Sequence, residues 1–447
     1  MGDLRDDQCA LARTITRMER DSASRDSKVA RELIRLRENI SYMPLKTSSS
    51  ASARLINSLL AAQKLATVGL PQESIMSSLV YSGMANRQGM IMPPEHCTYD
   101  WIFQTTSTAS EPVNFMSWLQ NDQGIFWING KAGSGKSTLM KHISNDKRTH
   151  AALKDWAAGR KLLIASHYFW SPGLPMEKSY SGLLRSIVYD IFRNSPALIK
   201  AVCGSRWAEA LRGRDVKSMP WSDTELQECV KALVTNNLEI EGQAVTPCFC
   251  IFIDGLDEYH GDQDLAKVLV SLANTCRVKI CASSRPWNKF EDAFVESKQR
   301  GNYLELHRHT QPDIAKVVEG ELGAKLTMIN RTGEEWKSLV QDVIDRAEGV
   351  FLWVTLVLKK ELIPCLENRE NIDFLRERLS TVPRGKSLAP SSGGLMFLLT
   401  TFKILMNISN TFLIASGPTT NTGRRSPGCS NLVWRQDVHC QWLLSAS

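Results

Sequence analysis

Residues 125–143 read IFWINGKAGSGKSTLMKHI, and this stretch decides the fold. An apolar run at 125–128 precedes the pattern Gly130-x-x-x-x-Gly135-Lys136-Ser137, and apolar residues at helical spacing follow it. A strand, a glycine-rich loop and a helix in this order let backbone N–H groups and the positive helix end surround a phosphate. The sequence therefore predicts a phosphate-binding loop within an α/β domain, rather than a chance glycine-rich turn.

The loop supplies the candidate ligands of a nucleotide. We expect Lys136 to reach the β- and γ-phosphates and the Ser137 hydroxyl to hold Mg²⁺. The predicted nucleotide-binding residues are the nine consecutive positions of the loop and helix start, Gly130, Lys131, Ala132, Gly133, Ser134, Gly135, Lys136, Ser137 and Thr138.

A second apolar run, FCIFID at 249–254, ends in an acid. We expect it to form a strand next to the loop strand, so that Asp254 emerges at the carboxyl edge of the sheet and holds Mg²⁺. Asp257 and Glu258 follow on the loop, where one of them can orient or deprotonate an attacking water. The alternative is that these residues are surface acids in a turn.

A third apolar run leads into CASSRP at 281–286. Arg285 would lie at the tip of the strand beside the acidic one, within reach of a γ-phosphate. The alternative for an arginine before a proline is an ordinary loop residue. The histidines at 307 and 309 are interpreted as a polar strand end, with a role facing phosphate as the alternative.

The fold class follows from five apolar runs that alternate with helical patterns. Such alternation predicts an α/β P-loop NTPase with a five-stranded parallel sheet and helices on both faces. The predicted strands are Ile125–Asn129, Lys161–Phe169, Cys248–Asp254, Val278–Ser284 and Tyr303–His307. The predicted helices between them are Gly182–Arg193, 224–234 and 264–274.

Composition and pattern divide the chain into five parts. The predicted parts are a helical N-terminal region at 1–74 (an adaptor, effector or coiled coil), a linker at 75–97, the NTPase domain at 98–310, a helical domain at 311–384, and an irregular tail at 385–447. Within the first part we expect two amphipathic helices and a third near 54–66, which leads into a looser segment.

Charge and cysteine usage limit the classes of partner. The net charge is +7, and most of the excess lies in the tail, where residues 384–447 hold six basic residues and one acid. A nucleic-acid-binding body is therefore not expected. Eleven scattered cysteines without zinc spacing, and no apolar signal segment at the start, favour the cytoplasm. An apolar block at 395–415 is interrupted by Lys403, so a membrane span is not favoured.

The motifs resemble the NACHT class of STAND NTPases, especially the NOD-like receptor proteins of filamentous fungi. The resemblance covers about residues 75–385, in the order and spacing of that family. Besides the loop, the matching pieces are TYDWIF at 98–103, HYFWSPG at 167–173, SGLLRSIVYDIF at 181–192, FIDGLDEY at 252–259, CASSRPW at 281–287, QPDIAKVV at 311–318 and AEGVFLWVTLVLKKEL at 347–362.

The resemblance implies a switch. An ADP-bound closed state would exchange to an ATP-bound open state, oligomerise, present the N-terminal region to protein partners, and reset by slow ATP hydrolysis in incompatibility or immune-type signalling. ATP rather than GTP is likewise implied by the resemblance. The alternative is a nucleotide-binding scaffold without significant turnover.

The C-terminal part departs from the family pattern. Family members continue after about residue 385 into a winged helix and sensor repeats, whereas this sequence changes composition there and shows no repeat. The break predicts a truncated product or a mis-joined reading frame. No sequence pattern in this chain therefore indicates how it would sense an upstream signal.

Overall fold

The computed structural model describes residues 12–18, 28–41, 57–58, 60–95, 98–104, 113–121, 123–235, 237–240, 243–331 and 333–385. The predictions for the tail, including its apolar block at 395–415, fall outside these residues. Among the described helices, none is both long and apolar enough to cross a membrane.

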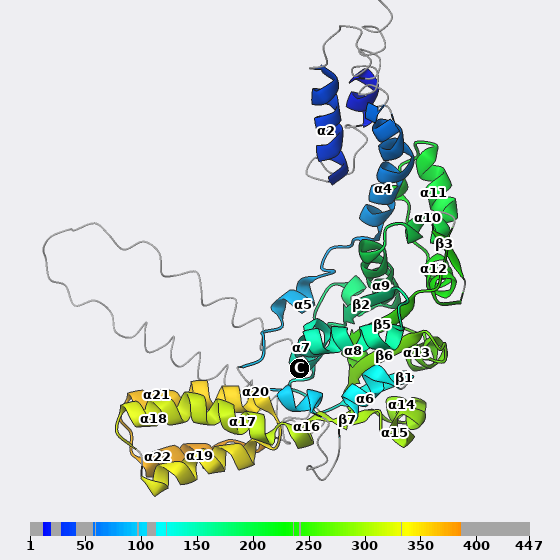
Figure 1. Ribbon diagram of the computed structural model, residues 1–447. Coiled ribbons are helices and arrows are strands. Elements are labelled where there is room, and N and C mark those ends of the chain that lie inside the picture. Colours follow the sequence, from blue (N-terminus) through cyan, green and yellow to red (C-terminus); the bar gives the residue numbers. More distant parts are fainter. Residues whose placement is uncertain are drawn as a thin grey trace, which may run out of the picture.

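A five-stranded sheet lies at the centre of the molecule (Figure 1). All of its strand pairs are parallel, and the strand order is β2–β5–β6–β1–β7. The strands are β1 (Gly124–Asn129), β2 (Leu162–Tyr168), β5 (Cys248–Asp254), β6 (Val278–Ser284) and β7 (Tyr303–Glu305). The predicted fold class, an α/β sheet of five parallel strands, is confirmed.

Both faces of this sheet are buried, which explains why its strands read as continuous apolar runs. Along β1, Ile125 and Trp127 pack into one hydrophobic core, while Phe126 and Ile128 pack into a second core on the other face. The strand β5 is buried at every position. Successive strand residues thus serve opposite layers of helices.

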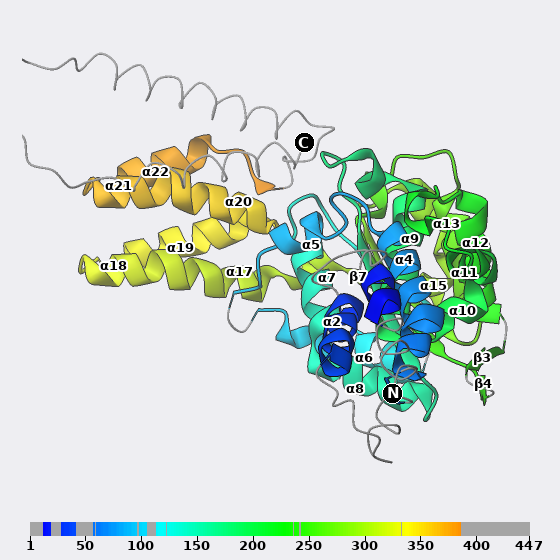
Figure 2. The same cartoon turned by 90° about the horizontal axis from the view of Figure 1, so that it is seen from above.

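Helices cover the two faces in separate groups (Figures 1 and 2). The core that contains Phe126 also takes in α6 (Phe115–Gln120), α7 (Lys136–Asn145) and α8 (Lys147–Ala157). The core that contains Trp127 takes in α9 (Tyr180–Asn194), α10 (Leu198–Val202), α11 (Gly204–Leu211), α12 (Asp223–Thr235), α13 (Leu265–Ala273) and α14 (Asn288–Ala293). The short helix α15 (Val295–Gln299) follows and contacts β1. The three helices predicted between the strands are present.

The fifth strand is shorter than predicted. It pairs with β1 only over Tyr303–Glu305, and the chain then turns into the short helix α16 (Leu306–His309). The reason is that β1 itself ends at Asn129, so the next residues have no strand to pair with. A small antiparallel hairpin, β3 (Leu238–Ile240) with β4 (Gln243–Val245), was not predicted.

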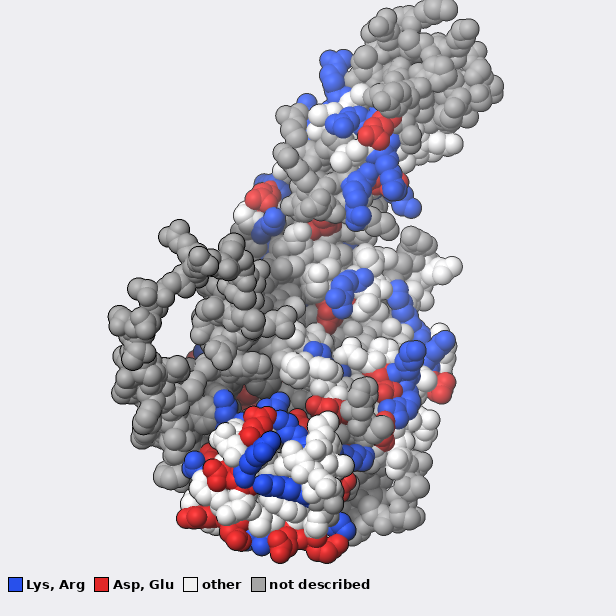
Figure 3. Space-filling model, turned by 90° about the vertical axis from the view of Figure 1, so that its left-hand side faces the viewer, with Lys and Arg blue, Asp and Glu red and all other residues white. Residues whose placement is uncertain are grey.

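Residues 311–384 form a helical bundle with a hydrophobic core of its own, which includes the fully buried Trp353 (Figure 2). Two π-helical turns, Glu319–Gly323 and Val357–Leu362, interrupt its helices. The helices are α17 (Gln311–Val318), α18 (Ala324–Met328), α19 (Glu334–Ala347), α20 (Phe351–Leu356), α21 (Ile363–Glu367) and α22 (Ile372–Thr381). On the face drawn in Figure 3, acidic and basic side chains alternate over this bundle.

The N-terminal region is helical, as predicted, over residues 12–18 and α2 (Lys28–Ser41). The third helix runs further than predicted. It passes through a π-helical turn at Leu65–Gly69 into α4 (Leu70–Leu79), instead of giving way to a loose segment. Ile75 and Leu79 explain the difference, since both are fully buried against the sheet domain. The short helix α5 (Asn86–Met90) follows.

A buried histidine on β2 makes the stability of the fold depend on pH. His167 is 4% exposed, and its Nδ1 lies 3.1 Å from Ser186 Oγ. Burial lowers the pKa of His167 to about 3. In the unfolded chain this histidine is protonated below about pH 6.5, whereas in the folded chain it stays neutral down to about pH 3. His167 therefore lowers the free energy of unfolding as pH falls from about 6.5 towards 3.

We expect His167→Gln to reduce the loss of unfolding free energy between pH 7 and pH 5 by roughly 2 kcal/mol. Urea unfolding at the two pH values measures it. The exposed loop residue His260 provides the matched control, and His260→Gln should lose stability as the wild type does. An unchanged pH dependence in His167→Gln would contradict the assignment.

Candidate nucleotide site

The glycine-rich loop connects β1 to α7, as the sequence predicts. Gly133 and Gly135 have φ values of +70° and +91°, a region that side chains other than glycine rarely adopt. Space is limiting as well, because a Cβ at Gly130 would meet Ser134 Oγ at 2.7 Å and one at Gly133 would meet Leu352 at 2.7 Å. The glycines thus allow the loop to curl tightly under its neighbours.

The groups that line the loop fit a phosphate. Lys136 Nζ donates to the carbonyl oxygens of Gly130 (2.7 Å) and Lys131 (2.9 Å). Burial lowers the pKa of Lys136, and the nearby acids Asp257 and Asp254 act in the opposite direction. Ser134 Oγ is buried without a hydrogen-bond partner among the described residues. A turned-in ammonium group and an unsatisfied hydroxyl are both groups that phosphate oxygens satisfy.

The acidic strand is not the immediate neighbour of the loop strand. β6 lies between β5 and β1, so the expectation of adjacent strands is wrong. Asp254 nevertheless ends β5 at the carboxyl edge, is 1% exposed, and accepts a hydrogen bond from Ser283 Oγ at 2.5 Å. Ser283 lies on β6, the strand between β5 and β1, and its hydrogen bond holds the Asp254 carboxylate in place.

The structure brings Asp257 and Arg285 together as a pair. Arg285 Nε lies 2.9 Å from Asp257 Oδ2, and the Arg285 backbone N–H donates to Asp257 Oδ1 at 2.9 Å. Glu258 accepts a hydrogen bond from the Ser171 N–H at 2.9 Å, and burial raises the pKa of Glu258. All three lie at the carboxyl edge of the sheet, where their predicted catalytic roles remain predictions.

The two histidines after β7 are helical, so their interpretation as a polar strand end is wrong. His307 lies near the loop, where burial and then the charge of Lys131 lower its pKa. His309 instead stacks on Trp101 with ring centroids 5.3 Å apart.

A metal would rely on few protein ligands here. Among the described residues, no three His, Cys, Asp or Glu side chains gather as a metal site. Ser137 Oγ and the Asp254 carboxylate are oxygen donors of the kind that Mg²⁺ accepts, with waters and phosphate oxygens completing its shell. The donor set thus fits a metal that arrives with a nucleotide.

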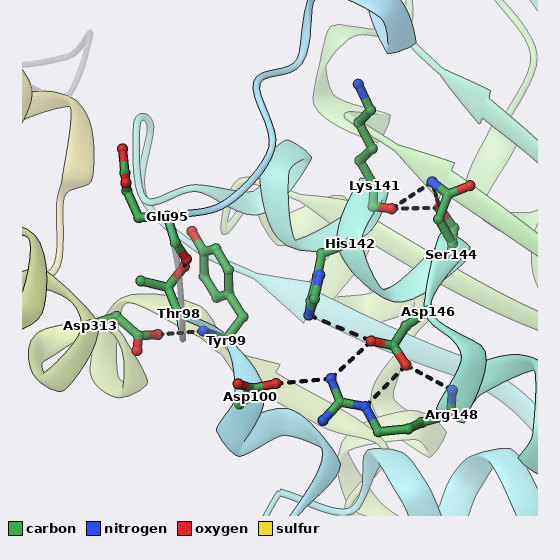
Figure 4. Close-up of polar contacts among 11 residues, drawn as sticks. Glu95, Thr98, Tyr99, Asp100, Lys141, His142, Ser144, Asp146, Arg148 and Asp313 are labelled. Carbon is green, nitrogen blue, oxygen red and sulfur yellow. Dashed lines mark hydrogen bonds and ion pairs between the residues drawn. The ribbon is translucent and has the colours of Figure 1, made fainter.

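Sequence reasoning gave no role to the segment at 98–104, although its motif was noticed. Figure 4 shows the backbone nitrogen of Tyr99 facing the carboxylate of Asp313, which lies in the first turn of the helical bundle. Asp313 Oδ2 accepts from the Tyr99 N–H (2.9 Å) and from Trp101 Nε1 (2.7 Å). The Tyr99 hydroxyl donates to the Gly135 carbonyl at 3.4 Å. One residue thus contacts both the loop and the bundle.

Sequence reasoning also missed Arg87 on α5, which no motif marks. Its Nη2 lies 3.5 Å from Ser137 Oγ, the hydroxyl predicted to hold Mg²⁺. The helix α7 holds α5 in place, since Lys141 Nζ donates to the carbonyl oxygens of Gln88 (2.7 Å) and Ile91 (2.6 Å). Only the tertiary structure places this arginine at the loop.

The helical bundle contacts the loop directly. The Leu352 N–H at the start of α20 donates to the Gly133 carbonyl at 3.0 Å, and Lys131 Nζ donates to the Glu348 carbonyl at 3.1 Å. The bundle thus contacts the loop at two points, Gly133 and Lys131.

The fold and the loop together define the class of this protein as an α/β P-loop NTPase. Residues 98–285 match a family model described as Nephrocystin 3, N-terminal. The chain is also 25% identical over 296 residues to the vegetative incompatibility protein HET-E-1 of Podospora anserina. Together with the motifs, these similarities support an assignment to the NACHT-type NTPases.

The extent of that similarity is partial. The alignment with HET-E-1 covers 64% of this chain and 19% of the relative, so the chain spans about a fifth of the curated protein it matches.

Proposed function

We propose that the protein binds ATP and ADP with Mg²⁺ and acts as a nucleotide-controlled oligomerisation switch in incompatibility or immune-type signalling. The observation that carries this proposal is the backbone hydrogen bond between Gly133 of the loop and Leu352 of the helical bundle. A loop that rearranges around phosphates must move or strain this bond, so the bound nucleotide can bias the position of the bundle.

The site residues have distinct roles in this proposal. Lys136 neutralises the β- and γ-phosphates, and the backbone of 130–138 surrounds them. Ser137 and Asp254 hold Mg²⁺, which when bound neutralises charge on the phosphates. Glu258 orients or deprotonates the attacking water, which its raised pKa favours. Asp257 is the second candidate for the same role. Arg285 reaches the γ-phosphate after leaving Asp257.

The division of the chain follows the same proposal. The NTPase domain spans 98–310 and the helical domain 311–384, and the helices before residue 75 contact protein partners. We also propose a cytoplasmic location, self-association on activation, and no nucleic-acid partner. The name of the relative, a vegetative incompatibility protein, supports the signalling context.

A second candidate, a scaffold that binds nucleotide without turnover, is favoured by a specific observation. Asp257 is paired with Arg285, and Glu258 is bonded to the Ser171 N–H, so both carboxylates are engaged within the protein. If these bonds persist with nucleotide bound, both oxygens of Asp257 and Oε2 of Glu258 stay occupied, which weakens their ability to take a proton from water.

Glu258→Gln separates the two candidates. We expect this variant to bind Mg–ATP as the wild type does and to hydrolyse it at least about 100-fold more slowly, because general-base catalysis contributes typically 10²- to 10⁴-fold. Single-turnover hydrolysis and light scattering measure the result. ATP-induced oligomers should persist in the variant and decay in the wild type.

Asp257→Asn belongs in the same series. Slow hydrolysis that stays unchanged in both variants would contradict the assignment of the acidic loop and favour the scaffold. If light scattering gives the wild-type protein the same molar mass with ATP as with ADP, nucleotide does not control oligomerisation and the switch is contradicted.

A further inference from the structure

The short helix α5 brings a positive charge to the candidate site from outside the sheet domain. Arg87 is half-buried, and its Nη2 lies 3.5 Å from Ser137 Oγ. Its charge also lowers the pKa of Glu258, against the rise that burial causes. The guanidinium therefore lies near both Ser137 and Glu258.

This location is on one side of Lys136. Ser137 follows Lys136 at the start of α7, and Glu258 lies on the acidic loop after β5. In the proposed function, Ser137 would hold Mg²⁺ beside the phosphates, and Glu258 would face the water that attacks the γ-phosphate. A cation near both residues is therefore placed at the terminal phosphate rather than at the sugar or base.

The backbone around Arg87 is fixed at two points. On the N-terminal side of Arg87, Arg185 of α9 donates to the carbonyl oxygens of Ser78 (2.6 Å), Leu79 (2.9 Å) and Val80 (3.1 Å). Lys141 on α7 donates to the carbonyls of Gln88 and Ile91 around it. We call residues 80–91 the α5 segment. These bonds present its arginine to the loop at low entropic cost, because the backbone is already ordered.

The charged side chains at this point balance one another formally, three basic against three acidic. Lys136, Arg285 and Arg87 face the three acids Asp254, Asp257 and Glu258, and Asp257 is already paired with Arg285. A triphosphate with Mg²⁺ adds negative charge that a guanidinium recognises through paired N–H donors.

We propose that Arg87 is a phosphate ligand supplied by the α5 segment, and that it contacts the terminal phosphate of a bound nucleoside triphosphate. This inference rests on the proposed function and extends it. It links the phosphate count of the nucleotide to the chain segment between the N-terminal helices and the sheet domain. ADP lacks the phosphate that Arg87 would contact, so only ATP would add a contact to the α5 segment.

The test measures binding rather than turnover. Fluorescent analogues of ATP and ADP are titrated with Mg²⁺ into the full chain and followed by anisotropy. We expect Arg87→Gln to weaken ATP binding about tenfold or more, the effect of losing a charge-assisted hydrogen bond, and to change ADP binding less than about twofold. Arg87→Lys, which keeps the charge without the planar fork, should lie between.

The matched control is Arg300→Gln, which removes the same charge from an exposed arginine between α15 and β7, at the opposite end of the sheet. It should leave both affinities unchanged. Hydrogen exchange of the α5 segment gives a second measurement: ATP should slow exchange more than ADP in the wild type, and this difference should disappear in Arg87→Gln.

The outcomes separate the two proposals. A wild type that binds neither nucleotide overturns the proposed function and this inference with it. A wild type that binds ATP, with Arg87→Gln and Arg87→Lys binding equally well, overturns only the role of Arg87. Equal weakening of ATP and ADP overturns the contact with the terminal phosphate. If Arg87→Gln binds both nucleotides more tightly than the wild type in the presence of Mg²⁺, Arg87 competes with the metal. That result would also overturn the contact with the terminal phosphate.

Discussion

Replacing Lys136 with alanine is expected to weaken Mg–ATP binding at least about 100-fold, because two phosphate contacts of an ammonium group are lost in a buried site. The structure supports a large effect, since Lys136 Nζ is turned into the loop and held by the Gly130 and Lys131 carbonyls. Isothermal titration of the full chain with Mg–ATP and Mg–ADP measures the change.

The matched control is Lys147→Ala, an exposed lysine at the first position of the next helix, α8. It removes the same charge and should leave nucleotide affinity unchanged. Undiminished Mg–ATP affinity in Lys136→Ala, with a native circular dichroism spectrum, would refute the assignment of the loop.

The second large effect is expected at Asp313, where the sheet domain joins the helical bundle. Asp313 is fully buried and accepts hydrogen bonds from the Tyr99 N–H and Trp101 Nε1. Asp313→Ala leaves the buried Tyr99 N–H and the partly buried Trp101 Nε1 without this acceptor. The cost is about 3 kcal/mol or more of unfolding free energy, because each unsatisfied donor costs roughly 1–3 kcal/mol.

The backbone of Tyr99 adds to this cost. Its φ is 65°, in the left-handed region that is unfavourable for residues other than glycine, and the bond to Asp313 helps to hold it there. Because Tyr99 also contacts Gly135, we expect Asp313→Ala to weaken nucleotide binding as well as the fold.

Urea unfolding followed by circular dichroism measures the stability of Asp313→Ala. Glu334→Ala, which removes a carboxylate that is 86% exposed on the same bundle, should change it by less than about 0.5 kcal/mol. Asp313→Asn keeps an acceptor oxygen and should lose less than Asp313→Ala. Equal stabilities of the wild type and Asp313→Ala would contradict the role of this carboxylate as the link between the two parts.

Where the sequence predicted well, the signal was local. The loop pattern at 130–137 needs only the glycine conformations and the start of one helix, and both are properties of neighbouring residues. The strands ending at Asp254 and at Ser284, the residue before Arg285, were likewise evident, because strands buried on both faces are mostly apolar.

Where the sequence predicted poorly, the deciding contacts were distant along the chain. The strand order could not be read from apolar runs, so β6 was not expected between β5 and β1. The end of β7 depended on where β1 ends, and the continuation of the third helix to Leu79 depended on burial against the sheet domain. Each of these features depends on which distant segment packs or pairs with the one in question. The residue pattern of a single segment does not contain that information.

The sequence by itself determined that this protein has a glycine-rich loop between a strand and a helix of a parallel α/β sheet, with acids and an arginine at or just after strand ends. These features follow from local backbone freedom and burial. Only the tertiary structure decided what surrounds that loop. It paired Asp257 with Arg285, placed Leu352 and Tyr99 against the glycines, and brought Arg87 to Ser137. These residues are far apart in sequence, and they meet because the helices packed on the sheet present them at the same edge.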